Sequence, residues 1–388
     1  MTTILIVLLV IVILGVGYHL FALLCVMDFF RKSGEQKAPR LSDEKAPAVS
    51  VLKPIKGIDP SCAENLASFL AQDYPRFEVL FGFRDADDPA ISIVTKMAAA
   101  APCDARVVVS DAGAGANLKA LNLQNLAEAA RYPMLALSDS DMVVDRDYLG
   151  RIVGEYLRGD RTGIVTSLYK TSRPASVGSA LESLTIALDF IPSVLVARRM
   201  EGITFGLGAS ILISKDVLRD IGGFAAVADY LADDYQIGYR CYQKGYKNVL
   251  SAYVIENRVG RMSIGEHLFH QLRWARTYRA SRPKGFLGYG ITHIFPFAVL
   301  LLIADPCPWT GVLVGLVLAL RYVLALSIHR KVISDAAWRR WLFLLPVKDI
   351  VSFIVWLWSF AGSKVCWRGT RYRLIGGGKI AKAGNGSE

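Results

Sequence analysis

Cysteine is sparse in this 388-residue chain, and its six cysteines form no recognisable pattern. No CxxC pair occurs and no cysteine stands at a zinc-ligand spacing from a histidine, which argues against a disulfide framework and a zinc site. Acidic residues are outnumbered, because 34 Asp and Glu face 45 Lys and Arg and leave a net charge of +11. Nucleic-acid-binding motifs are lacking, so we expect no nucleic-acid partner for this charge.

The first apolar run, Ile4 to Val26, lacks both features of a cleaved signal peptide. No Lys or Arg precedes it and no small-residue cleavage site follows it, so we expect a transmembrane anchor over residues 1–28. The linker over residues 29–46 is basic, with Arg31, Lys32, Lys37 and Arg40. Positive charge gathers on the cytosolic side of membranes, which predicts an outside N-terminus and a cytosolic domain after the anchor.

Apolar residues make up 53% of the chain and return near its end. Runs at 286–304 and 309–328 are joined by the short turn ADPCP, which predicts a hairpin whose second arm returns to the cytosol at HRK (329–331). A last run over 341–363 carries Lys348 and Asp349. Because charges in a membrane segment are costly, we expect these two side chains inside the bundle, paired with each other or with the chain.

The basic tail, residues 364–388, leaves the topology of residues 286–363 open. Four simple crossings would place Lys364, Arg368, Arg371 and Arg373 outside, against the distribution of charge in membrane proteins. Either this chain departs from that rule, or the last run is broken or re-entrant.

The segment between the apolar regions, residues 47–260, alternates β-branched runs with helical patterns. Strand–helix alternation predicts an α/β domain with a mostly parallel, Rossmann-like sheet, here on an α-helical transmembrane base. The expected strands are VSVLK, FEVLFGF, ARVVVS, MLALS and GIVTSL; the helices include CAENLASFLAQ and LNLQNLAEAARY.

Three groups of aspartates fall where ligands meet such a sheet, beyond the carboxyl ends of strands. They are RDADDP (84–89), SDSD (138–141) and ADDY (232–235), the last of which follows a Gly-Gly turn and opens a helix. Each group alone is explained by the frequency of Asp in loops and at helix N-termini. Three groups at one sheet favour a site.

The chemistry of a nucleotide-sugar donor suits these groups. A hard divalent cation bridges diphosphate oxygens and takes carboxylate ligands, and Asp139 and Asp141 point to one side of an extended segment. One of the two is expected to bind metal while the other meets sugar or ribose. Asp85 or Asp88 is expected near the base or ribose. Asp234 is the candidate base for the acceptor hydroxyl, with Asp233 capping the helix.

A basic helix follows at residues 261–285. It holds five Lys or Arg between His267 and Lys284 and includes Arg273 and Trp274. Its cations fit either a leaving nucleoside diphosphate or an anionic lipid surface, and both interpretations stay open.

Together these motifs resemble the processive-type family 2 glycosyltransferases and, more closely, family 21, the ceramide glucosyltransferase group. The matching stretches are VLKPIKGIDP (51–60), DADDPA (85–90), GANLKALNL (115–123), ALSDSDM (136–142), GLGASILISKDVL (206–218), ADDYQIG (232–238) and WRGTRYRLIGGG (367–378).

The resemblance implies a GT-A fold, a UDP-sugar donor with UDP-glucose first, Mg²⁺ or Mn²⁺, a lipid acceptor such as ceramide, and inversion at the anomeric carbon. It makes Asp88, Asp139 and Asp234 the three key aspartates, with Asp234 catalytic and Asp139 and Asp141 as metal ligands. It implies donor-binding roles for Lys53, Pro54, Asp85, Asp88, Asn117, Lys119, Asp139, Arg273 and Trp274. It implies acceptor-binding roles for Pro192, Gly208, Asp233 and His270.

Two positions depart from the family pattern. The motif (Q/R)xxRW would begin at His270, and the His-Pro of the animal enzymes is Ile191-Pro192 here. The second change bears on the acceptor, so transfer of N-acetylglucosamine to a hopanoid polyol is the alternative. A processive polysaccharide synthase would use the same aspartates, and we would expect it to have more spans. The expected location is a bacterial inner membrane, or the Golgi or ER membrane of a eukaryote.

Overall fold

The computed structural model describes residues 3–35, 46–59 and 61–383. The predicted linker and tail lie partly outside these residues, at 36–45 and 384–388. The chain divides into two compact units. The membrane unit, as we call it, comprises residues 1–34, 170–200 and 260–367; the sheet unit comprises residues 35–169, 201–259 and 368–388. The expected domain over 47–260 differs from this division, since 170–200 groups with the apolar helices and 368–388 with the sheet.

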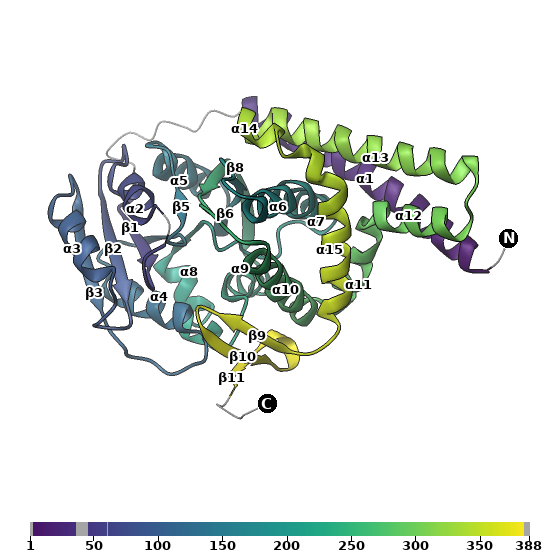
Figure 1. The fold of residues 1–388 in the computed structure, drawn as a ribbon. Helices are drawn as coiled ribbons and strands as arrows, with labels where there is room; N and C mark the ends of the chain where they lie inside the picture. Colours follow the sequence, from purple (N-terminus) through teal and green to yellow (C-terminus); the bar gives the residue numbers. More distant parts are fainter. Residues whose placement is uncertain (1–2, 36–45, 60, 384–388) are drawn as a thin grey trace. The chain divides into compact units, whose positions relative to one another are not determined.

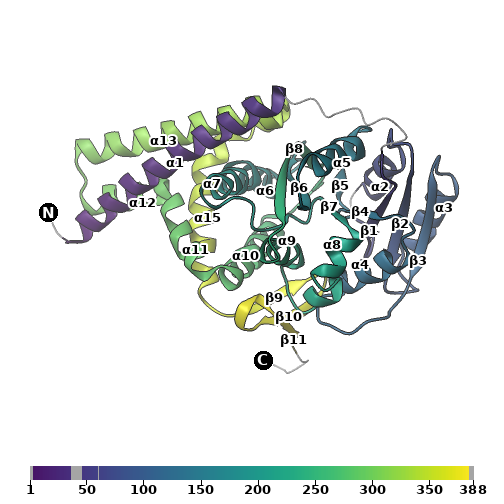
Figure 2. The same ribbon diagram turned by 180° about the vertical axis from the view of Figure 1, so that it is seen from behind.

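The sheet unit is built on eight strands in the order β3-β2-β1-β4-β7-β6-β8-β5 (Figures 1 and 2). Strands β1 to β4 are parallel, and β7 lies antiparallel between β4 and β6. The predicted α/β class and all five predicted strands are therefore confirmed. The strands are β1 Val49–Pro54, β2 Phe77–Phe83, β3 Asp104–Val109, β4 Met134–Leu137, β5 Met142–Val143, β6 Thr162–Thr171, β7 Ile211–Ser214 and β8 Lys247–Asn257.

Helices cover the sheet, and a small hairpin completes this unit. The helices are α2 Cys62–Leu70, α3 Ile91–Ala99, α4 Leu118–Ala129, α5 Tyr148–Arg158, α8 Lys215–Asp220, η2 Phe224–Val227 and α9 Asp233–Gln243. Strands β10 Thr370–Leu374 and β11 Ile380–Lys382 pair antiparallel, with the turn η6 Gly376–Gly378 between them.

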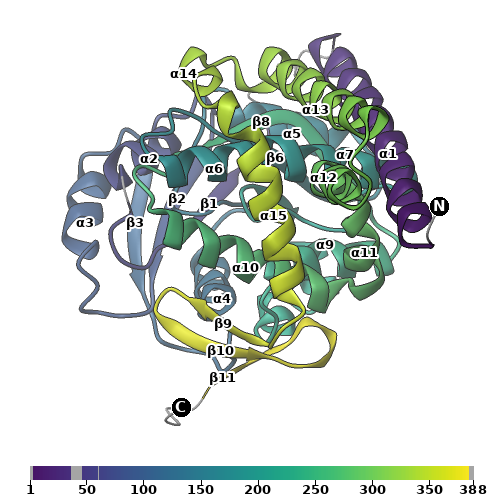
Figure 3. The same cartoon turned by 45° about the vertical axis from the view of Figure 1, so that its right-hand side comes forward.

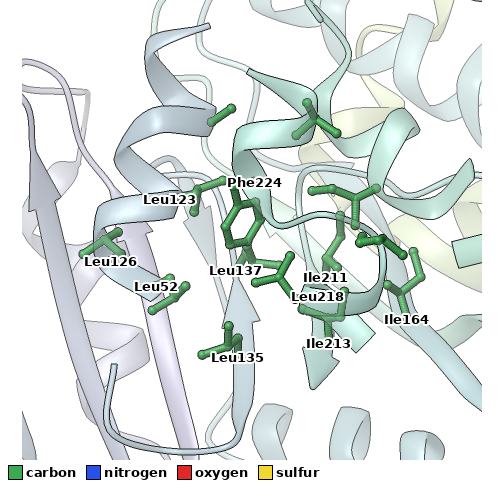
Figure 4. Close-up of a cluster of buried hydrophobic side chains, with 14 of the residues drawn as sticks. Leu52, Leu123, Leu126, Leu135, Leu137, Ile164, Ile211, Ile213, Leu218 and Phe224 are labelled. Atoms are coloured by element: carbon green, nitrogen blue, oxygen red, sulfur yellow. The ribbon is translucent and has the colours of Figure 1, made fainter. Parts of the chain in front are cut away.

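Alternation of side chains along the strands builds the core on one face of the sheet. Leu52, Leu135 and Leu137 pack against Leu123 and other residues of α4, α8, η2 and α9 (Figure 4). Lys53 has the opposite parity and therefore points to the other face, where it meets Phe69 of α2. One strand thus supplies both the core and a polar group below the site.

The membrane unit is a bundle of helices (Figure 3). Its elements are α1 Thr3–Glu35, α6 Val177–Thr185, η1 Ile186–Phe190, α7 Ile191–Glu201, α10 Ile264–Ser281, α11 Pro283–Gly288, η3 Tyr289–Thr292, α12 Ile294–Ala304, α13 Pro308–Ile328, η4 His329–Ile333, α14 Ala336–Arg339, η5 Leu342–Leu344, α15 Leu345–Ser359 and β9 Lys364–Trp367. Helix α1 packs closely at Gly15, where a Cβ atom would lie 1.9 Å from the Ile294 side chain.

Four helices of the described chain are long and apolar enough to cross a membrane: Thr3–Arg31, Val177–Glu201, Pro308–Ile333 and Leu342–Ser359. The span predicted at 286–304 is instead a bent pair, Pro283–Thr292 with Ile294–Ala304, with an angle of 59° between them. Val177–Glu201 was not predicted, because Glu182, Asp189 and two arginines interrupt its hydropathy.

The charged side chains inside this helix bundle are compensated by a buried network of ion pairs. Lys348 Nζ lies 2.7 Å from Asp349 Oδ1, so the predicted pairing of these two side chains is confirmed. Arg321 of α13 forms a two-pronged contact with Asp349 at 2.6 and 2.8 Å. Asp189 of η1 accepts from Lys348 at 2.6 and 2.7 Å and from Arg321 at 3.2 Å. Two cations and two carboxylates therefore balance inside the bundle.

The helix predicted over residues 261–285 is mainly α10, which begins with a capping box between Ser263 and Glu266. Arg276 and Arg279 do not extend freely from it. They donate to the carbonyl oxygens of Ala361, Lys364 and Gly362, which follow the C-terminus of α15. These two of its five cations therefore connect α10 to the turn between α15 and β9.

Candidate active site

The candidate site is a small, partly open pocket in the sheet unit, at the carboxyl ends of β1 and β4. Six of the predicted site residues line it: Pro54, Lys119, Asp139, Gly208, Asp233 and Asp234. Apolar side chains complete the wall, namely Leu123, Leu137, Ile211 and Ile237. Residues from five separate stretches of sequence thus converge on one pocket, as the sheet topology requires.

The antiparallel strand β7 brings in the glycine of this pocket. Ile211, its first residue, pairs with Leu137, the last residue of β4, so the chain before β7 passes beside the SDSD loop. Gly208 N donates to Asp234 Oδ2 at 2.7 Å. A Cβ at Gly208 would lie 3.0 Å from Asp234 Oδ2, 3.3 Å from Asp139 Oδ2 and 3.3 Å from Lys119 Nζ. The missing side chain is what lets these three polar groups meet.

We therefore expect Gly208→Ala to lower sugar transfer by about tenfold while leaving thermal stability nearly unchanged. The added methyl group pushes on charged side-chain ends at the site, and a 1 Å misplacement of reacting groups costs up to about a hundredfold in rate. Steady-state kinetics and a melting curve measure the two quantities. Gly150→Ala on α5 is the control, since nothing lies within 4 Å of a Cβ there. Equal rates for the two variants would contradict the placement of Gly208 in the site.

Asn117 and Lys119 are positioned by the start of α4. Asn117 caps the helix, because its side chain accepts from the amides of Lys119 and Ala120. Its Nδ2 donates to Tyr230 O at 2.7 Å and to Asp233 Oδ1 at 3.3 Å, which ties α4 to the start of α9. Lys119, two residues on in the first turn of α4, extends its ammonium to 2.5 Å from Asp139 Oδ1 and 3.8 Å from Asp233 Oδ2. Although burial acts against it, these carboxylates raise the pKa of Lys119 well above its usual value.

The contacts of Asp233 and Asp234 differ from the predicted ones. Asp233 does not cap α9: the N-cap is Ala232, and Asp233 is buried against Asn117 and Lys119. Asp234 is half-buried and accepts from two main-chain amides, those of Gly208 and Tyr235. Burial, followed by the charge of Asp233, raises the pKa of Asp234 to about 6. A carboxylate with this pKa is ionised at neutral pH and is still basic enough to take a proton.

Lys53 was predicted to bind the donor, but its side chain is fully buried below the SDSD loop. Its ammonium donates to Asp139 O, lies 3.4 Å from Ser138 Oγ and sits 3.7 Å from the centre of the Phe69 ring. Burial lowers the pKa of Lys53 to about 7, against the charges of Asp139 and Asp141. The structure therefore makes Lys53 a support for the loop that carries Asp139 rather than a surface contact.

The surroundings of Asp141 bear on the metal site predicted at Asp139 and Asp141. Its Oδ1 is enclosed and has no hydrogen-bond partner among the described residues, and burial together with the charge of Asp139 raises the pKa of Asp141. Among the described residues, no group of three or more His, Cys, Asp or Glu side chains is arranged to hold a metal ion. Asp139 lines the pocket and Asp141 does not, but the unpartnered oxygen of Asp141 fits a divalent cation that completes its shell with Asp139, diphosphate oxygens and water.

Asp85 and Asp88 lie in the loop after β2 and do not line the pocket. Asp88 accepts from Gly57 N at 2.8 Å and Ala90 N at 2.9 Å, and Asp85 accepts from Asp87 N at 3.0 Å. Asp88 thus joins the loops after β1 and β2, which places it at the same edge of the sheet as Pro54.

Sequence reasoning missed a neighbouring pair, Asp59 and Arg368. Arg368 contacts both carboxylate oxygens of Asp59, at 2.6 and 3.2 Å, and Ser140 of the SDSD loop donates to the same carboxylate. Arg368 and Gly369 adopt positive φ angles of 49° and 79°, typical of a tight turn. The separation of 309 residues leaves no local pattern that predicts this contact.

In the membrane unit, the predicted residues His270 and Trp274 lie on α10. The buried carboxylate of Glu182 accepts from His267 Nδ1 at 2.7 Å, His270 Nδ1 at 2.8 Å and Gln271 Nε2 at 2.9 Å. The His270 ring centre lies 4.7 Å from that of Trp274. Glu182 was not predicted as a partner. The roles predicted for Pro192, His270, Arg273 and Trp274 stay predictions.

Comparison with known proteins adds the family. The sequence pattern of Glycosyl transferase family 21 matches residues 7–380. The chain belongs to this family. The predicted resemblance is thereby confirmed, and with it the expectation of a glycosyltransferase.

Individual relatives are more distant. Ceramide glucosyltransferase 3 of Caenorhabditis elegans is 26% identical over 260 residues, which are 67% of this chain and 56% of that protein. Ceramide glucosyltransferase 1 of the same organism is 22% identical over 368 residues, 88% of this chain and 75% of that protein. A Pyrobaculum calidifontis mannosyltransferase, solved with GDP-mannose and Mn²⁺, superposes with a TM-score of 0.53 at 20% identity, covering 90% of this chain and 99% of its own. The last likeness supports the predicted GT-A-like fold.

Proposed function

We propose that this glycosyltransferase moves a sugar, glucose in the first instance, from a UDP-sugar to the hydroxyl group of a membrane lipid such as ceramide, at the cytosolic membrane face. The observation that carries the proposal is the convergence of Lys119, Asp139 and Asp234 on one pocket. This set provides a carboxylate for a diphosphate-bound cation, a cation for phosphate and a separate carboxylate for a proton. The names of the family relatives support the lipid acceptor.

The reaction assigns one task to each group. The acceptor oxygen attacks the anomeric carbon, the bond from that carbon to the phosphate oxygen breaks, and UDP leaves with the bonding electrons. Asp234 takes the hydroxyl proton as attack proceeds, a task worth about 10² to 10⁴ in rate. Lys119 donates to the departing phosphate. When bound, Mg²⁺ or Mn²⁺ supplies Lewis-acid stabilisation of the diphosphate, and Asp139 and Asp141 would hold it.

The contacts of the three lining carboxylates support Asp234 as the base. Asp233 is held by Asn117, and Asp139 is paired with Lys119. Asp234 is half-buried and accepts from the main-chain amides of Gly208 and Tyr235, so it is the carboxylate that we assign to the acceptor proton.

Transfer of radiolabelled sugar from UDP-glucose and from UDP-N-acetylglucosamine tests the proposal. Purified protein receives each donor with ceramide or with a hopanoid polyol, and products are partitioned between chloroform and aqueous ethanol. We expect a chloroform-soluble product from UDP-glucose and ceramide that Asp234→Asn does not form. A product only from N-acetylglucosamine and the polyol would select the alternative acceptor. An ethanol-insoluble product would indicate a polymer synthase and refute lipid transfer.

A further inference from the structure

Lys119 is the single cation among the residues that line the pocket, and it already has a partner there. Its ammonium lies 2.5 Å from Asp139 Oδ1 and 3.8 Å from Asp233 Oδ2, and the pocket's third carboxylate, Asp234, also faces Gly208. Lys119 is about one fifth exposed and Asp139 about one third, at 21% and 34% of their side-chain surfaces. Both groups are therefore within reach of a ligand that enters the pocket.

Two cations can bind the carboxylate of Asp139, namely the ammonium of Lys119 and a divalent metal ion. A divalent ion that binds the carboxylate of Asp139 approaches an ammonium 2.5 Å from Oδ1. Like charges a few ångströms apart repel strongly where the dielectric constant is low. Simultaneous binding of the metal ion and Lys119 to this carboxylate is therefore unfavourable. Asp141 is a second ligand for the metal and has no ion pair with Lys119, so the competition concerns Asp139 alone.

A diphosphate removes the conflict, because its oxygens accept both cations. Phosphate oxygens form short charge-assisted hydrogen bonds with lysine and also complete the shell of a divalent ion. Gly208 has no side chain, and an ideal Cβ there would lie 3.3 Å from this ammonium, so the glycine avoids a close contact with Lys119.

We propose that Lys119 and the divalent cation compete for the carboxylate of Asp139, and that the donor diphosphate ends the competition by accepting Lys119. Metal and nucleotide then bind cooperatively, and free metal is held weakly until the nucleotide arrives. The inference rests on the proposed function only for the class of ligand, a nucleoside diphosphate. Because coupling between two ligands is reciprocal, the nucleotide strengthens metal binding by the same factor as metal strengthens nucleotide binding.

The test measures Mn²⁺ affinity by the electron paramagnetic resonance signal of free Mn²⁺, with and without saturating UDP. In the wild type we expect Mn²⁺ to bind at least ten times more tightly with UDP. In Lys119→Met, free Mn²⁺ should bind at least threefold more tightly than in the wild type. Its gain from UDP should fall below threefold, because the competitor and the phosphate contact are both lost. Lys119→Arg keeps the charge and should retain the wild-type coupling.

The controls identify the site and the fold. Lys96→Met removes an exposed lysine on α3 and should leave both affinities unchanged. Asp139→Asn in the Lys119→Met background should abolish the tighter binding of free Mn²⁺. Melting curves in the absence of ligand show that each variant is folded, and Lys119→Gln replaces Lys119→Met if the latter does not fold.

Three results would overturn the inference. Lys119→Met binding free Mn²⁺ no more tightly than the wild type would mean that the lysine does not compete. Wild-type UDP affinity that is the same in EDTA and in Mn²⁺ would mean that Lys119 serves in place of a metal. A wild type that binds neither UDP nor GDP would remove the ligand class itself. Failure of lipid transfer with intact coupling would instead refute the proposed function alone.

Discussion

Asp234→Asn is expected to lower sugar transfer by at least about a hundredfold while UDP still binds with near-normal affinity. The amide keeps the shape of the carboxylate but has no basicity, and general-base catalysis contributes about 10² to 10⁴ in rate. The carboxylate oxygens of Asp234 accept from Gly208 N at 2.7 Å and from Tyr235 N at 2.8 Å, and the single amide oxygen of Asn reproduces one of these two bonds. The measurements are single-turnover transfer to lipid and UDP binding with Mn²⁺ present.

The pH dependence of wild-type activity is an independent test of Asp234 as the general base. Burial and the charge of Asp233 raise the pKa of Asp234 to about 6, so below this pH the carboxyl group is protonated and cannot accept the hydroxyl proton. We therefore expect kcat/KM to fall as pH drops through about 6 and to be level above it, whereas the residual activity of Asp234→Asn should lack this limb. Because the neighbouring aspartates interact, the apparent value belongs to the group of carboxylates.

Asp233→Asn is the matched comparison, one residue away in the same turn. Asp233 is buried, and its partners are Asn117 and Lys119, so its loss should weaken UDP binding or lower the melting temperature more than it lowers the chemical step. Wild-type turnover in Asp234→Asn, together with a hundredfold loss in Asp233→Asn, would exchange the two roles.

The pocket was largely predictable because it sits at strand ends. Asp139 follows the parallel strand β4, and polar residues at the carboxyl ends of parallel strands meet at one edge of the sheet. Asp234 is the second residue of α9, which follows η2 and not a strand, so the predicted strand-end position of ADDY was wrong although Asp234 lines the pocket. What the pattern did not predict is the direction of individual side chains. Lys53 differs from Leu52 by one position of a strand, and that step turns it from the core face to the underside of the SDSD loop.

Contacts between residues distant in sequence account for the other differences between the prediction and the structure. Nothing local in the sequence indicates that Arg368 meets Asp59, that Glu182 gathers three side chains of α10, or that β7 inserts between β4 and β6. The span Val177–Glu201 was overlooked because its charged residues depress hydropathy. In the bundle, Asp189 within that span has Lys348 and Arg321 as partners, so its charge is compensated by helices distant in sequence.

Asp349→Ala is expected to destabilise the membrane unit by about 3–5 kcal/mol, the usual cost of leaving a buried charge without its partner. Asp349 receives two hydrogen bonds from Arg321 and lies 2.7 Å from Lys348. Its loss leaves both cations to share Asp189, in a part of the bundle where Lys348 and Arg321 are 1% and 2% exposed. Chemical unfolding in detergent and the yield of monodisperse protein measure the effect.

The double variant Lys348→Met/Asp349→Leu separates charge balance from packing. It removes one cation with one anion and leaves Arg321 beside Asp189, 3.2 Å apart, so the network stays neutral. Replacing a buried ion pair by apolar groups of similar size is often close to neutral in stability, so the double variant should be more stable than Asp349→Ala. The exposed pair Asp216–Arg219, 3.0 Å apart, is the control, and Asp216→Ala should leave unfolding unchanged because exposed pairs contribute little. If Asp349→Ala unfolds like the wild type, water reaches Asp349 and the network does not hold the bundle together. If the double variant is the less stable one, the contacts of these side chains matter more than their charge balance.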